Sequence, residues 1–310
     1  MYHNQLKSFK GKKVVEFDPE MNSALDCANM VYRISATADV STWEAKDTVE
    51  ECLKKYLAMA GASETESIIF GAYDVEYSEC SPEIFRILVE EKSKLPKLKS
   101  AFFGDTLYEE AMLSCIFQDD FTGFFEAYPG LQYCHIRSGD GLMIRPFRHV
   151  SLETLVLETA GMNKKILSQL TECVLPELTH LELWMGNDDY GWNGRIEDIQ
   201  PFFDSSLFPK LIYLGIKCSQ IADQVAEAVA ESSILNQLKE LDLSGGLMSD
   251  AGAEKLLASS RISRLENLNL EENYLSDELE KLFKNLSNVQ VNFGDQKQDE
   301  GWGRYVSVAE

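Results

Sequence analysis

The sequence predicts an α/β solenoid, in which short parallel strands alternate with helices. Three observations support this fold class. A short apolar motif recurs along the chain, each copy alternates apolar with polar residues, and the spacing between copies leaves room for a helix. One strand–helix unit cannot bury its own apolar face, so neighbouring units must stack. We therefore expect a parallel sheet on one side of the repeats and helices on the other.

The clearest copy of the motif is LENLNLEEN (265–273), which matches the pattern L-x-x-L-x-L-x-x-N of leucine-rich repeats. Copies in the same phase begin at residues 65, 98, 131, 152, 178, 211, 238, 265 and 286. Of the 27 positions expected to face inward, 26 are apolar, and Thr65 is the exception. This agreement predicts about nine leucine-rich repeats in a horseshoe, with the parallel sheet on its concave face and the helices on its convex face.

Helix signals occupy the segments between the motifs. SDAGAEKLLAS (249–259) begins with a Ser/Asp cap and then has helical apolar spacing, and ADQVAEAVAESSIL (222–235) has the same character. In a longer insertion at 104–127, the segment 109–117 is also expected to be helical. The repeat domain is predicted to span residues 65–294.

The two ends of the solenoid need covering. Residues 1–64 are predicted to form an α/β N-terminal cap, with strands at 14–18 and 30–35 and a helix over 41–60 that starts at a Ser/Thr pair. Residues 295–310 form a C-terminal tail. Its Trp302, Tyr305 and Val306 either cap the last repeat or stay mobile.

Charge and cysteine content restrict the class of function. The formal net charge is −22, from 29 basic and 51 acidic residues, so phosphate backbones and anionic membranes are repelled and we expect neither nucleic-acid nor membrane binding. No apolar run approaches the roughly 20 residues that cross a bilayer, and the start lacks the apolar core of a secretory signal. The seven cysteines include no C-x-x-C, which favours reduced thiols in a cytoplasmic protein.

The residues between the inward positions should project from the concave face as one continuous patch, because neighbouring strands lie about 4.8 Å apart. Aromatic and arginine side chains near its centre are typical of binding hot spots. We therefore predict a non-enzymatic protein- or peptide-binding module, with Tyr133, Trp184 and Tyr213 as an exposed aromatic cluster. The candidate partner-binding residues are Tyr133, His135, Arg137, His180, Glu182, Trp184, Tyr190, Trp192, Tyr213, Lys217 and Asp242. The acidic surface favours a partner with a basic patch.

Two insertions leave alternatives open. In the segment 186–207, Tyr190 and Trp192 either form a lip over the concave groove or pack back on the repeats. If this insertion closes a pocket over His180, Glu182, Asp188 and Tyr190, a small-molecule or enzymatic role becomes the alternative function. At the other end, outward-facing Ile69 and Phe102 must be covered, either by the 104–127 insertion or by the N-terminal segment.

Motifs for other chemistry are weak. Asn187, Asp188 and Asp189 do not continue into an EF-hand, and His135 and His180 are separated by a whole repeat, so we expect no metal site. LSGG (243–246) lies in the repeat phase, and no phosphate-binding loop accompanies it. Cys218 is expected at a surface or turn. We therefore predict neither catalytic residues nor a cofactor.

Several stretches are similar to a bacterial, cytoplasmic leucine-rich-repeat family of unassigned function. They include FFGDTLYEEAMLSCIFQDD (102–120), LPELTHLELWMGNDDYG (175–191), FPKLIYLGIK (208–217), LKELDLSGGLMSDAGAEKLL (238–257) and RYVSVAE (304–310). Tyr32 stands where this family usually has a tryptophan. The family is encoded beside radical-SAM enzymes, a phosphatase-like hydrolase and an ATP-grasp-like protein. The resemblance implies an accessory of a modification pathway, and it supplies no catalytic residues.

Overall fold

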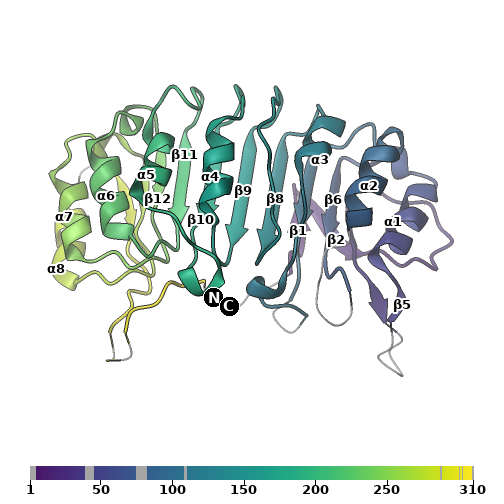
Figure 1. Ribbon diagram of the computed structural model, residues 1–310, viewed down its shortest axis with the longest axis horizontal. Coiled ribbons are helices and arrows are strands. Elements are labelled where there is room, and N and C mark those ends of the chain that lie inside the picture. Colours follow the sequence, from purple (N-terminus) through teal and green to yellow (C-terminus); the bar gives the residue numbers. More distant parts are fainter. Residues whose placement is uncertain are drawn as a thin grey trace. The chain divides into compact units, whose positions relative to one another are not determined.

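The computed structural model describes residues 5–38, 45–74, 82–107, 110–286, 288–299, 301 and 303–308. The chain divides into two compact units, Tyr2–Leu152 and Glu153–Glu310, and each is described by itself. In each unit a mostly parallel sheet is covered on one side by helices (Figure 1). This architecture is the predicted α/β solenoid of strand–helix repeats.

In the unit Tyr2–Leu152, the strands of the sheet follow the order β1-β2-β3-β6-β7-β8. β1 pairs antiparallel with β2, whereas each later neighbour pairs in parallel. The strands are β1 (Ser8–Phe9), β2 (Lys12–Glu16), β3 (Met30–Ile34), β6 (Ser67–Phe70), β7 (Ser100–Phe103) and β8 (Tyr133–Ser138). The helices are α1 (Val49–Ala58), α2 (Pro82–Glu90) and α3 (Thr122–Ala127), and β4 (Thr37–Ala38) pairs with β5 (Ala45–Asp47) outside the main sheet.

In the unit Glu153–Glu310, the sheet runs in chain order from β9 to β14, and its neighbours pair in parallel. The strands are β9 (Thr154–Thr159), β10 (His180–Trp184), β11 (Tyr213–Lys217), β12 (Glu240–Asp242), β13 (Asn267–Asn269) and β14 (Gln290–Asn292). The helices between them are α4 (Lys164–Thr171), α5 (Ile196–Ile199), α6 (Ala222–Glu231), α7 (Asp250–Ala258) and α8 (Asp277–Phe283). α6 and α7 confirm the helices predicted at 222–235 and 249–259.

The strand register confirms the repeat phase. The second motif position of each repeat lies directly beside the same position of the next, as in the series Leu155, Leu181, Leu214, Leu241, Leu268 and Val291. From Leu155 to Leu268 these side chains are buried beneath the helices. Thr65, the polar exception, is also buried, and its hydroxyl lies 2.7 Å from the hydroxyl of Tyr56. A hydrogen bond therefore satisfies the one polar inward side chain.

Of two helix predictions in the first unit, the helix over 41–60 is confirmed except at its start, and the helix over 109–117 is wrong. Ala45–Asp47 forms β5, and α1 starts at Val49 because Thr48 and Glu51 make a capping box, in which each side chain bonds the other's backbone N–H. The rest of that predicted start, residues 41–44, lies outside the described residues. In the segment 109–117, the structure has a short 3₁₀ helix at Leu113–Cys115, and residue 109 is not described. The helix of that insertion is α3, further along the chain.

The C-terminal tail packs on the second unit. Val306 and Val308 are buried, and the N–H of Ser307 donates to the carbonyl of Gly245. The Lys297 ammonium donates to the Gly245 carbonyl, the Tyr305 carbonyl and the Ser307 hydroxyl. Trp302 lies outside the described residues. Among the helices that the structure describes, none has the length and apolar character needed to cross a bilayer.

Candidate functional site

The outward side chains of β10, β11 and β12 form a polar cluster in the second unit. The Tyr213 hydroxyl lies 3.2 Å from Oε2 of Glu182 and 3.1 Å from Oδ2 of Asp242, so a single O–H serves two carboxylates. Gly215 stands in the strand between these carboxylates. A Cβ there would lie 3.1 Å from Cγ of Glu182 and 3.2 Å from Cε1 of Tyr213. Glycine therefore leaves the space in which the tyrosine ring lies across the strand.

Lys217 supplies the positive charge of this cluster. Its Nζ is 3.3 Å from Oε1 of Glu182, 3.9 Å from Oδ2 of Asp242 and 4.2 Å from the centre of the Trp184 ring. Burial alone lowers the pKa of Lys217, but the two carboxylates outweigh it, so the net pKa is raised and the ammonium stays charged. Burial, with the same carboxylates, raises the pKa of Tyr213, so the phenol stays protonated. The cluster thus has two carboxylates for one ammonium.

His180 covers the cluster on its open side. Its ring stacks on Tyr213 with the centroids 3.8 Å apart, and Nε2 lies 3.6 Å from Oε2 of Glu182. The His180 side chain is 31% exposed, compared with 15% for Glu182 and 10% for Asp242. On the next strands, Glu240, Asn267 and Gln290 lie in the same row as His180 and Tyr213. A partner at this face would meet the histidine ring and this polar row first.

The predicted exposed aromatic cluster is wrong at Trp184, which is only 7% exposed. Its indole N–H donates to Oε1 of Glu182, and Lys217 lies over the ring. Trp192 is also buried. For this side chain of the 186–207 insertion, the alternative that is observed is packing back on the repeats, not a lip over the concave groove. Tyr190 is half-buried in a 3₁₀ helix at Asp188–Tyr190. Trp184 and Trp192 therefore support the fold rather than forming an exposed surface.

The alternative pocket is not assembled from its four predicted residues. His180 starts β10, whereas Asp188 and Tyr190 follow its C-terminal end. A strand of this length spans about 13 Å at about 3.3 Å per residue. Asp188 instead accepts a hydrogen bond of 2.9 Å from the Gln220 amide. The side chains that the enzymatic alternative requires are thus divided between the two ends of the strand.

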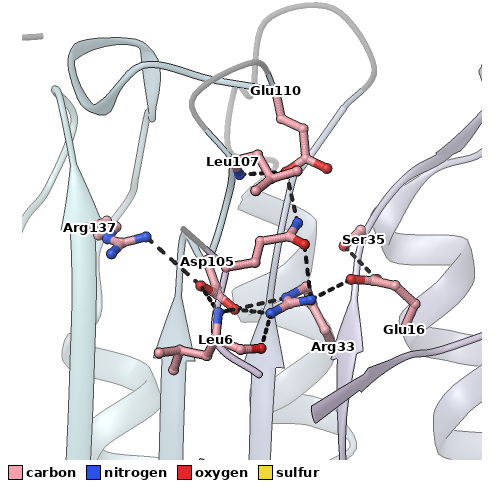
Figure 2. A network of polar contacts seen from close by, with 9 residues as sticks. Leu6, Glu16, Arg33, Ser35, Asp105, Leu107, Glu110 and Arg137 are labelled. Carbon is pink, nitrogen blue, oxygen red and sulfur yellow. Dashed lines mark hydrogen bonds and ion pairs between the residues drawn. The ribbon is translucent and has the colours of Figure 1, made fainter. Parts of the chain in front are cut away.

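In the first unit, a buried ion pair organises the outward face (Figure 2). Asp105 is fully buried and Arg33 is 4% exposed. Nε of Arg33 donates to Asp105 over 2.8 Å, and Nη1 donates to Glu16 over 2.6 Å. Burial lowers the pKa of Arg33, but Glu16 and Asp105 reverse this effect and raise it. The backbone of Leu6 joins the pair, since its N–H donates to Asp105 and its carbonyl accepts from Nη2 of Arg33.

The predicted binding residues of β8 lie beneath the N-terminal segment or against neighbouring side chains. Tyr133 contacts Phe9 edge-on at 5.4 Å and has the Lys10 ammonium 3.6 Å from its ring centre. His135 stacks on Phe102 at 4.1 Å. Arg137 is 8% exposed, with Nη1 3.9 Å from Oδ1 of Asp105. The expectation of an open face at Tyr133 and Arg137 is therefore wrong, because Phe9 and Lys10 cover Tyr133, and Arg137 lies against Phe102 and Asp105.

The N-terminal segment also covers Ile69 and Phe102. Both are buried in a cluster with Phe9, Val14 and Val31. Of the two candidate covers, the N-terminal segment is the one observed in this cluster. Arg33 and Asp105 were not among the predicted site residues, although each is a charged residue within an apolar stretch. Arg33 lies in MVYRIS (30–35), and Asp105 ends SAFFGD (100–105). Such charges in apolar surroundings are the signal that could have identified the ion pair.

Cys218 is buried, contrary to the expectation of a surface position. It directly follows β11, in a bend with a left-handed φ of 53°, and burial raises the pKa of its thiol to about 12. A thiol with a raised pKa is a poor nucleophile at neutral pH. Across the residues that the structure describes, no group of three or more His, Cys, Asp and Glu side chains is placed to hold a metal ion.

Comparison with solved structures finds one protein of similar fold and two weaker matches. A protein from Bacteroides fragilis has a crystal structure similar to this chain, with a TM-score of 0.82 and 27% identity over 90% of this chain and 77% of that one. An internalin from Listeria monocytogenes has a TM-score of 0.42, with 15% identity over 86% and 67% of the two chains. A TLR13–ssRNA13 complex has a TM-score of 0.41, with 14% identity over 89% and 35%. The sequence matches no protein-family model and no curated protein.

Proposed function

We propose that the protein is a non-enzymatic interaction module, and that the outward face of β10–β14 binds a protein or peptide partner. The observation that carries this proposal is the polar cluster of Glu182, Tyr213, Lys217 and Asp242. Two carboxylates share one ammonium and one phenol, beneath a partly exposed histidine. A cluster that holds more negative than positive charge attracts a basic group of a partner.

The rest of this face adds two negative charges and neutral amides. Glu240, Asn267 and Glu271 are half-buried outward side chains, and Asn292 is exposed. Together with the net charge of −22, they favour a partner with a basic patch and disfavour nucleic acid or an anionic membrane. Electrostatic complementarity of this kind accelerates association and selects partners more than it increases raw affinity.

The cellular setting is part of the proposal. The resemblance to the bacterial leucine-rich-repeat family supports an accessory role in a cytoplasmic modification pathway. We retain the proposed division of the chain into a cap over 1–64, repeats over 65–294 and a tail over 295–310. In this division the repeats carry the binding face, and the two ends cap the repeats.

Affinity capture from native-host lysate tests the proposal. A face variant would carry Glu240→Lys and Glu271→Lys. A matched control would carry Glu231→Lys and Glu254→Lys, two exposed positions on α6 and α7. We expect wild type and control to retain the same basic protein, and the face variant to lose it. Equal retention by all three proteins would contradict a site on this face, as would loss in the control alone.

A further inference from the structure

The first unit has a second surface with features of a peptide site, and the chain itself fills it. We propose that the outward face of β3, β6, β7 and β8 is a groove for an extended peptide, now occupied by residues 5–10 (the arm). A partner segment with leucine, aromatic and basic side chains at the spacing of Leu6, Phe9 and Lys10 binds there in exchange for the arm. This site lies in a different unit from the acidic face and takes a different ligand, so it stands independently of the proposed function.

The groove recognises the backbone of its occupant. The Leu6 N–H lies 3.2 Å from both carboxylate oxygens of Asp105, and the Leu6 carbonyl lies 2.8 Å from Nη2 of Arg33 (Figure 2). These bonds go to a main-chain N–H and a main-chain carbonyl, so an extended segment of another sequence can supply them equally well. A carboxylate and a guanidinium on the two sides of one residue therefore form a clamp for an extended backbone.

Side-chain contacts set the chemistry of the occupant. Phe9 is 6% exposed and packs in one cluster with Ile69 and Phe102, and Tyr133 lies against it. The Lys10 ammonium lies 3.6 Å from the centre of the Tyr133 ring, within the range of a cation–π interaction. The side chains of Lys7 and Ser8 are exposed. The groove thus selects an aromatic residue followed by a basic one and tolerates variation at the two preceding positions.

The arm is joined weakly to the rest of the sheet. β1 pairs with β2 at Ser8↔Lys13 and Phe9↔Lys12, and the Val14 N–H donates to the Lys7 carbonyl over 3.0 Å. The turn at Lys10 and Gly11 has left-handed φ values of 49° and 76°. The groove contacts therefore provide a large share of what holds the arm. Arm departure would also leave the buried Asp105 without its Leu6 donor, which is costly. For this reason we infer exchange of one occupant for another rather than an empty groove.

Peptide exchange tests the proposal. A protease site inserted between Lys10 and Gly11 of the full chain lets the arm be cut while it remains bound. The probe is a fluorescent peptide of residues 1–10, MYHNQLKSFK. We expect saturable binding by fluorescence anisotropy to the cleaved, folded protein. We expect at least tenfold weaker binding when the peptide carries Phe9→Ala. We also expect at least tenfold weaker binding of the original peptide to the uncleaved chain, because its tethered arm competes at high effective concentration. No exchange, or equal binding of both peptides, would overturn the proposal.

If the cleaved chain unfolds, that result also counts against an arm that can be exchanged. A measurement on the intact protein checks this result. Hydrogen–deuterium exchange compares the Leu6 amide with the amides of β7 in the uncut chain. An arm that exchanges through local opening loses protection at Leu6 at least tenfold faster than β7 does. Equal rates at Leu6 and β7 would mean that the arm leaves only with global unfolding, and they would overturn the proposal.

Discussion

Tyr133 and Tyr213 occupy the same motif position in two repeats, yet their surroundings differ. Tyr133 lies beneath Phe9 and Lys10 of the N-terminal arm and packs against the buried cluster that contains Ile69 and Phe102. Tyr213 is covered by the partly exposed His180 and bonds two partly exposed carboxylates. The repeat therefore determines where an outward side chain points. Chain segments outside the repeat motif determine whether it meets protein or solvent.

The largest difference between the two faces is expected at their aspartates. Asp105→Asn removes the buried charge partner of Arg33 and leaves it with the exposed Glu16, which should cost about 3 to 5 kcal/mol of unfolding free energy. Asp242→Asn should cost less, about 1 to 2 kcal/mol, because Lys217 keeps Glu182 as a charge partner and the acceptor for the Ser244 N–H persists. Urea unfolding of both variants measures the difference. Equal losses would show that the two faces are equally buried.

Aromatic contacts give the next largest contrast. Phe9→Ala removes a 6%-exposed ring from the cluster on Ile69 and Phe102 and should cost about 3 kcal/mol. His180→Ala removes a ring that stacks on Tyr213 but is partly exposed, and should cost about 1 kcal/mol. Thermal unfolding of the two proteins under the same conditions checks this order. A reversed order would mean that the arm contributes little to the first unit.

A smaller effect is expected at Gly215 of the second face. In Gly215→Ala the new Cβ would crowd Glu182 and the Tyr213 ring, which should cost about 1 kcal/mol and displace the tyrosine. The matched control is Gly130→Ala in the first unit, where a Cβ would have no atom within 4 Å, and we expect almost no change. Chemical denaturation and tyrosine fluorescence together test both. An undisturbed Gly215→Ala protein would show that the Tyr213 position does not depend on the glycine.

A further effect concerns the tail of the second unit and depends on pH. Burial lowers the pKa of Lys297 to about 8 in the folded protein, below the ordinary value of 10.5. Between these values the unfolded chain binds more protons than the folded one, so this residue makes stability rise as pH increases through about 8. The free energy of unfolding of wild type, relative to Lys297→Met, should therefore increase from pH 7.5 to 10. A flat or falling difference would contradict a lowered pKa.

The sequence predicted the repeat phase because the leucine positions depend only on local period and burial. Leu181, Leu214 and Leu241 lie in the register that their spacing required. The candidate site was predicted only in part. Tyr213, Lys217, Glu182 and Asp242 do come together, because parallel strands bring equivalent positions side by side.

Most of the predictions that were wrong concerned residues whose surroundings depend on other segments of the chain. Residues 5–10 cover Tyr133 through contacts across about a hundred positions, and no local pattern specifies that fold-back. Trp184 is buried because Lys217 and Glu182 surround its indole. The α1 start was misplaced because the sequence holds two capping-box patterns, Ser41 with Glu44 and Thr48 with Glu51, and α1 starts at the second.

Photo-crosslinking at Asn267 tests the central claim most directly. A photoreactive residue placed there, on the outward side of β13, should capture a partner in native-host lysate, and about 0.5 M salt should weaken the capture because charge attraction is screened. The same residue at Glu254, exposed on α7, serves as the control and should capture nothing specific. A salt-sensitive crosslink at Asn267 alone is the predicted result. Capture only at Glu254, or at neither position, would contradict a partner-binding face on the second unit.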